Sequence, residues 1–303
     1  MQDENESTDL PLIDTLDLEI LMHRDVHFGG SFPIMIDYYN QDGVGVMPDF
    51  EIEQLENLSH LEQELGQNLS DLYLSEEAKK VVEEARELYN QLRTSYTESN
   101  LETPLLISDL ILSEEAEPLK EMEAIVKEGK TLVPALIHLI SSTSFYDPLF
   151  PGYGRSPIFA AKCLAKIQDT RAIAPLFEAI GEENFFTDEE IIKALCSFGE
   201  KAKSFLLKIL KHKPFSKENE HAAIVLSTFP EDPEIASVCL DLLKQEEVLQ
   251  KPRFASYLIF ACSALSTPLE KETFIEVSKK PTLPKELQKE MEVIIRNWRH
   301  RLE

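Results

Sequence analysis

A pattern that returns every 31 residues in the middle of the chain is the feature that most constrains its fold. Leu164, Leu195 and Leu226 are equally spaced, and each follows an Ala or Ile four positions earlier. A second stretch with apolar residues at helical spacing comes after each of them. Repeats of this length are typical of helix-turn-helix units that stack on one another. The sequence therefore predicts an all-α fold in which paired helices form an α-α superhelix.

Three regions are predicted along the chain. Residues 1–11 are polar and acidic without apolar periodicity, so we expect a disordered tail. Residues 12–112 contain helix-like stretches without the 31-residue repeat, and are predicted to form a smaller acidic helical region. Residues 113–303 are predicted to form the repeat solenoid, which ends in a capping helix with a polar outer face.

Local signals predict individual helices within these regions. The stretch 32–39 is densely apolar and fits a buried helix or a short strand, of which we favour the helix. Ser75 is predicted to cap the longest helix of the N-terminal region. Ser113, which precedes a similar Glu-Glu-Ala sequence, is predicted to cap the first helix of the repeat array.

The repeated units resemble HEAT-like repeats of the short bacterial kind, which also occur in phycobilisome-lyase-like proteins. The similarity rests on Ala-Ala-x-x-Leu-Ala-x-Ile at residues 160–167, on Ala-Pro-Leu at 174–176 and on Ala-Leu-x-x-Phe-Gly at 194–199. It covers about residues 113–279, and it implies a right-handed superhelix whose second helices line a concave face. Proteins of this kind are mostly scaffolds and adaptors. The resemblance therefore implies a non-catalytic protein-binding function.

Some proteins with such repeats are enzymes, and the residues of this chain bear on two of these alternatives. The di-iron hydroxylases use paired His-Glu dipeptides, but none of the seven histidines here is followed by Glu. Bilin lyases lack a signature that could be tested residue by residue, so a lyase-like activity stays open as an alternative. On balance we expect no enzymatic activity and no cofactor.

The charge of the chain is concentrated in its first part. Residues 1–130 hold 31 Asp and Glu against 8 Lys and Arg, whereas residues 131–303 hold 24 against 22. A negative field repels phosphate backbones, so nucleic acid is not an expected partner. The expected partner is a protein or peptide. A basic partner surface would be attracted by the acidic region, but that region could equally be a solvated surface.

The sequence also indicates in which cellular compartment the protein is expected. No apolar run approaches the roughly 20 residues that a membrane-spanning helix needs. The first residues are acidic and do not have the basic start and apolar core of a secretion signal. We therefore expect a cytoplasmic protein without membrane contact, in which the four cysteines, none in a Cys-x-x-Cys pair, are buried free thiols.

Two histidines form the best candidate for a metal site. His23 and His27 are four residues apart, so on a helix they share one face and could hold a metal ion together. A third ligand would have to come from Asp37 or Asp42. The alternative is a histidine-rich turn with ordinary hydrogen bonds.

Two aromatic segments are candidates for partner binding. A long loop between the first two repeats contains aromatic residues and an arginine, which are types that dominate interface hot spots; these are Phe145, Tyr146, Phe150, Tyr153 and Arg155. The last predicted helix adds Trp298 beside several basic residues. In the alternative, the loop aromatics fold back into a gap in the stack and Trp298 is buried in the capping helix.

Overall fold

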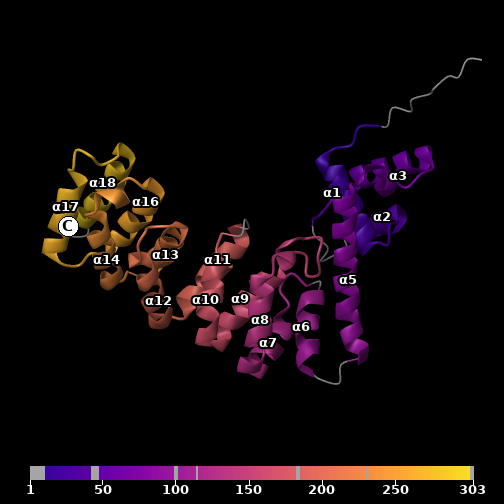
Figure 1. The fold of residues 1–303 in the computed structure, drawn as a ribbon, viewed down its shortest axis with the longest axis horizontal. Coiled ribbons are helices and arrows are strands. Elements are labelled where there is room, and N and C mark those ends of the chain that lie inside the picture. Colours follow the sequence, from indigo (N-terminus) through magenta and orange to yellow (C-terminus); the bar gives the residue numbers. More distant parts are fainter. Residues whose placement is uncertain are drawn as a thin grey trace, which may run out of the picture. The chain divides into compact units, whose positions relative to one another are not determined.

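The computed structural model describes residues 11–41, 48–98, 102–113, 115–181, 185–229 and 231–300. Within these ranges the chain is helical, with α1–α18, the 3₁₀ helices η1–η4 and no β-strand, which confirms the all-α fold (Figure 1). None of the described helices has both the length and the apolar character needed to cross a membrane. Of the predicted tail at 1–11, all but residue 11 lies outside the described residues, and so does Asp42.

The chain divides into two compact units. The first comprises residues 1–127 and 142–159, and the second comprises residues 128–141 and 160–303. Residues 113–127 and 142–159, which the sequence assigned to the solenoid, thus pack with the N-terminal helices. The physical reason lies in the loop, because Leu149 and Phe150 are buried against Ala85 in the core of the first unit.

The helices of the first unit follow from apolar stripes and caps. They are α1 (Thr15–His27), α2 (Phe32–Asn40), α3 (Ile52–Leu65), α4 (Leu69–Tyr73), α5 (Glu76–Glu98), α6 (Glu102–Leu112) and α7 (Leu119–Glu128), with the 3₁₀ helix η2 (Thr143–Tyr146) in the loop. The apolar stretch 32–39 is thus helical, as predicted. Its Phe32 and Met35 pack with Leu21 and Leu55, and all four side chains are almost fully buried.

Of the two predicted serine caps, one is present and one is not. The Ser75 hydroxyl accepts the Ala78 backbone N–H at 3.1 Å, which confirms it as the cap of α5. The prediction for Ser113 was wrong, because α7 begins at Leu119. Pro118 determines this start: its carbonyl accepts the Met122 N–H, and its fixed φ suits the beginning of a helix.

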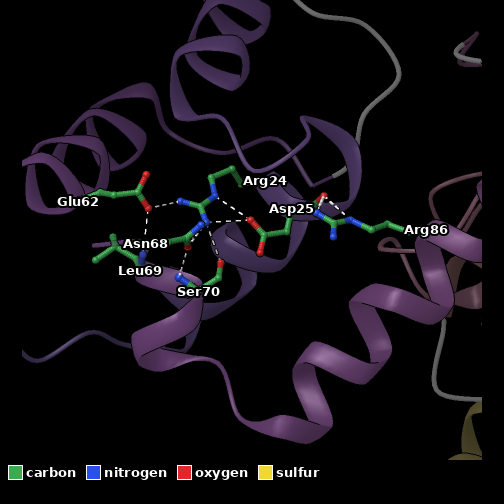
Figure 2. Close-up of polar contacts among 7 residues, drawn as sticks. All are labelled: Arg24, Asp25, Glu62, Asn68, Leu69, Ser70 and Arg86. Carbon is green, nitrogen blue, oxygen red and sulfur yellow. Dashed lines mark hydrogen bonds and ion pairs between the residues drawn. The ribbon is translucent and has the colours of Figure 1, made fainter. Parts of the chain in front are cut away.

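A buried arginine joins three helices of the first unit (Figure 2). Arg24 of α1 is fully buried and donates from Nη1 to Glu62 of α3, and from Nη2 to Asn68 Oδ1 at 2.9 Å and to Ser70 Oγ at 2.8 Å. Asp25 accepts from its Nε at 2.9 Å, and the Phe32 ring lies 4.6 Å from the guanidinium carbon. The charge is therefore paired and its donors are used, as a buried charge requires.

The second unit is a succession of helix pairs. Its helices are α8 (Val133–Ser141), α9 (Ser156–Ile167, of which residues 160–167 belong to this unit), α10 (Ile173–Glu178), α11 (Phe185–Ser197), α12 (Glu200–Lys211), α13 (Lys217–Ser227), α14 (Pro233–Leu243), α15 (Glu246–Leu249), α16 (Pro252–Ala261), α17 (Pro268–Ser278) and α18 (Lys285–His300). The 3₁₀ helices are η1 (Gly129–Thr131), η3 (Thr170–Ala172) and η4 (Cys262–Ala264). Within the unit the helices follow one another in chain order (Figure 1).

Equivalent leucines anchor the successive pairs. Leu164 lies in α9, Leu195 in α11 and Leu226 in α13, and each side chain is at most 1% exposed. Among the first helices of the pairs, α11 contacts α13, and α13 contacts α16. The 31-residue spacing found in the sequence thus corresponds to buried leucines in α9, α11 and α13, each the first helix of a pair.

Candidate functional site

The predicted histidine pair lies on one face of α1. The rings of His23 and His27 are stacked, with centroids 5.2 Å apart and planes inclined by 29°. Aromatic rings surround them: Phe50 lies 5.4 Å from His23, and Tyr89 and Tyr153 lie 5.4 Å and 5.1 Å from His27. The chain leaves the helix immediately afterwards, because Gly29 and Gly30 follow with positive φ.

Burial determines the charge of this pair. It lowers the pKa of His23 to about 4, and burial together with repulsion from His23 lowers the pKa of His27 to about 3. Both imidazoles are therefore neutral at pH 7. Among the described residues, His23 Nδ1 and His27 Nε2 are buried without a hydrogen-bond partner.

The described residues do not supply a complete metal site. They contain no group of three or more His, Cys, Asp and Glu side chains arranged to hold a metal ion. Asp37, considered as a third ligand, is exposed on α2 and accepts a hydrogen bond from Gln41. The metal-binding role of His23 and His27 stays a prediction.

The aromatic loop is mostly packed inside the first unit. Phe145 and Phe150 are 5% and 8% exposed, whereas Tyr146, Tyr153 and Arg155 are half-buried. The Arg155 guanidinium donates to the backbone carbonyl of Glu115 at 3.3 Å. Phe150 thus folds back against the N-terminal helices rather than over a gap in the repeat stack, and three of the five side chains stay accessible in part.

Trp298 is buried in the terminal helix α18. Its ring packs against Phe274 with centroids 5.2 Å apart, and its Nε1 donates to the Ser263 carbonyl at 3.0 Å. The side chain is 8% exposed. Trp298 therefore stabilises the end of the second unit, and its contribution to partner binding stays a prediction.

A groove that was not predicted from the sequence crosses the first helices of three successive helix pairs in the second unit. It has a volume of about 550 Å³ and is walled by apolar or half-buried side chains of α11, α13 and α16. The central wall residues are Ile192, Cys196, Ile224, Thr228 and Tyr257. Charged side chains of both signs surround this apolar floor, namely Asp188, Glu189, Lys193 and Arg253.

The groove continues into a second hollow along α16. This hollow of about 440 Å³ shares Thr228, Arg253 and Tyr257 with the first and adds Phe260. The Phe260 side chain is 70% exposed, and Arg253 pairs with Glu220 at 2.8 Å on the rim. A bound chain could therefore bury aromatic surface and form ion pairs on the same face.

One of the four cysteines belongs to the groove. Cys196 is half-buried and lies 3.1 Å from the Thr228 hydroxyl, and burial raises its pKa. Cys163, Cys239 and Cys262 are buried free thiols, as the sequence predicted, whereas the prediction of full burial was wrong for Cys196, which borders the groove. The groove was hard to predict because Ile192, Ile224 and Tyr257 resemble additional core residues. Their spacing of 32 and 33 residues, close to the length of the repeat, was the signal that could have indicated a shared face.

No protein-family model matches the chain, and no curated protein sequence matches it.

Proposed function

We propose that the chain is a non-catalytic protein-binding adaptor whose HEAT-like repeats form an α-α superhelix. The partner segment lies in the groove walled by α11, α13 and α16. The observation that carries the proposal is an open apolar groove that extends over three helix pairs and contains Tyr257, Arg253 and the exposed Phe260. Helical-repeat proteins use extended surfaces of this kind to hold other chains.

The side chains of the groove support a protein or peptide ligand. Tyr and Arg are enriched among residues that contribute most to interface affinity. Phe260 is exposed by 70% in the free chain, so its burial under a partner would remove a large apolar area from water. Carboxylates and basic groups on the rim would select a segment that combines apolar anchors with charges of both signs.

The acidic N-terminal region would speed the initial association with a partner rather than form part of the groove. A net charge of −23 over residues 1–130 attracts basic surfaces and repels nucleic acid. We accordingly propose a protein partner with a basic surface outside the groove, and a cytoplasmic site of action without membrane contact.

Affinity purification from the native cell tests the proposal. The bait would be the intact chain, the Tyr257→Ala/Phe260→Ala variant, and a Leu269→Ala control, whose side chain is 73% exposed on α17 and outside the groove. The proposal expects one protein to co-purify with the intact chain and the control but not with the double variant. Binding of that purified protein is then measured by calorimetry.

A separate bait tests the loop hypothesis. Tyr146→Ala changes a half-buried loop residue that lies outside the groove. If this variant loses the partner and Tyr257→Ala/Phe260→Ala retains it, the binding surface is the loop. If all variants retain the partner, neither surface is responsible.

A further inference from the structure

The first unit contains a cavity that the adaptor function does not use. It has a volume of about 470 Å³, within the range of pockets that hold small organic molecules. The end of α1, the helix α2 and the loop residue Tyr153 form part of its wall. The remaining wall is one face of α5, where Arg86, Tyr89, Asn90 and Arg93 follow the helical spacing of three and four residues.

The charge of this cavity is opposite to that of its surroundings. No Asp or Glu is among the described residues that line it, although residues 1–100 hold 23 acidic and only five basic side chains. Arg24 is used in the buried network, and the two lysines pair with Glu76 and Glu84. The other two basic side chains, Arg86 and Arg93, both line the cavity.

The two guanidinium groups are available for an anion. Arg86 donates from Nε and Nη2 to the Asp25 carbonyl, which orients the group and leaves Nη1 free of that contact. Arg93 is exposed and its guanidinium carbon lies 5.9 Å from the centre of the Tyr89 ring. Neither arginine forms an ion pair with a carboxylate of the described residues.

Aromatic rings provide much of the cavity wall, and one of them belongs to a residue with left-handed backbone. Phe28, Tyr38, Tyr89 and Tyr153 all line the cavity. Tyr153 has φ of 52°, between Gly152 at 88° and Gly154 at 72°. Left-handed backbone is uncommon for a bulky residue and is often found at binding sites. Here it keeps the Tyr153 ring against His27, 5.1 Å between centroids.

We propose that this cavity binds a small organic anion that contains an aromatic or other flat apolar group. The flat group lies among the Phe and Tyr rings, and the acid group, a carboxylate or a phosphate, accepts hydrogen bonds from Arg86 and Arg93. Arginine suits both acid groups because its planar donors match their oxygens. The aromatic cavity wall then distinguishes this ligand from inorganic anions, which gain no apolar contact with the rings.

A pair of fluorescent probes separates the role of charge from that of apolar contact. 8-Anilinonaphthalene-1-sulfonate is an aromatic anion, and N-phenyl-1-naphthylamine has the same ring system without the charge. The intact chain should bind the anion at least tenfold more tightly than the neutral probe, and Arg93→Gln should weaken anion binding about tenfold, or about 1.4 kcal/mol. Binding of the neutral probe should be unchanged in Arg93→Gln.

Lys80→Gln is the matched control. It removes the same charge from the exposed face of α5, where Lys80 is 77% exposed and pairs with Glu84 rather than lining the cavity. Anion binding that is equal in Arg93→Gln and the intact chain, or equally weakened by Lys80→Gln, would overturn the proposal. Circular dichroism of each variant verifies that the helices are intact.

Competition identifies the acid group. Benzoate, phenyl phosphate, inorganic phosphate and phenol are each titrated against the bound anionic probe. Displacement by benzoate or phenyl phosphate, but not by phenol or inorganic phosphate, supports the site and shows which acid it prefers. Displacement by neither aromatic acid, or displacement by phenol or inorganic phosphate as effective as that by the aromatic acids, contradicts it.

Discussion

Replacing Arg24 by methionine is expected to destabilise the first unit strongly. Methionine keeps the apolar volume of the side-chain stem but removes the guanidinium group that bonds Glu62, Asn68 and Ser70. Removal of one partner from a buried ion pair costs about 3–5 kcal/mol, because the other partner loses its compensation. Glu62 is 25% exposed and still accepts the Leu69 backbone N–H, so water and that bond offset part of the loss. We therefore expect a decrease of about 3–4 kcal/mol in the free energy of unfolding.

Urea unfolding followed by far-UV circular dichroism measures this decrease. With a denaturant dependence of about 2 kcal/mol per molar urea, the midpoint should fall by roughly 1.5–2 M. Lys80→Met is the control, since an exposed ion pair on a helix contributes only about 0.3–0.5 kcal/mol. Arg24→Lys keeps the charge without the planar donors and should give an intermediate midpoint. A midpoint for Arg24→Met that equals that of Lys80→Met would refute the reasoning.

Three further predictions concern the anchors, the histidines and the cysteines. Leu195→Ala should lower the free energy of unfolding of the second unit by about 2–5 kcal/mol, because the side chain is fully buried. The fluorescence of Trp298, which lies in this unit, follows its unfolding. A decrease below about 1 kcal/mol would contradict the anchor role. The pKa values of His23 and His27 are about 4 and 3 in the folded chain against 6.5 in the unfolded chain. The unfolded state therefore binds protons first as the pH falls below about 6.5, and stability should decrease by about 1.4 kcal/mol per pH unit for each histidine down to about pH 4. Urea midpoints between pH 7.5 and 5 test this, and the same slope in His23→Gln/His27→Gln would disprove it. Of the four thiols, Cys196 should react first with iodoacetamide, since the other three are buried. Its reaction should become faster as the pH rises, because the thiolate is the reactive form and burial raises the pKa of Cys196. Peptide mapping that finds Cys239 modified first would exclude this ranking.

The repeat region was predictable because its structural signal is local and recurs. The Leu anchors are spaced 31 residues apart and each follows an Ala or Ile by four positions, so Leu164, Leu195 and Leu226 could be matched without knowledge of the fold. Ser75 was also predictable, since a cap depends on residues only three positions away. Ser113 has the same local sequence, yet Pro118 moved the start of the helix.

Contacts between distant parts of the chain could not be predicted in this way. Arg24 meets Glu62, Asn68 and Ser70, which follow it by 38, 44 and 46 residues, and no spacing rule connects them. The loop at 142–159 packs with the N-terminal helices, although it follows a helix of the second unit in the sequence. Its aromatic composition was evident, but whether the rings face a partner or the core depends on these distant neighbours.

The groove and the cavity share this limitation. Tyr257 and Phe260 fit the apolar pattern of α16, and only the exposure of Phe260 separates the groove side from the core side. The spacing of Arg86 and Arg93, two helical turns apart on α5, can be read from the sequence. The rings opposite them come from other elements, so the cavity itself could not be predicted.

Site-specific photo-crosslinking in the native cell tests the central claim most directly. A benzophenone amino acid would replace Tyr257 in the groove and, in a control chain, Leu269 on the exposed face of α17. The adaptor function predicts one discrete crosslinked protein from position 257, absent from position 269. No discrete product from position 257, or the same product from both positions, would contradict it.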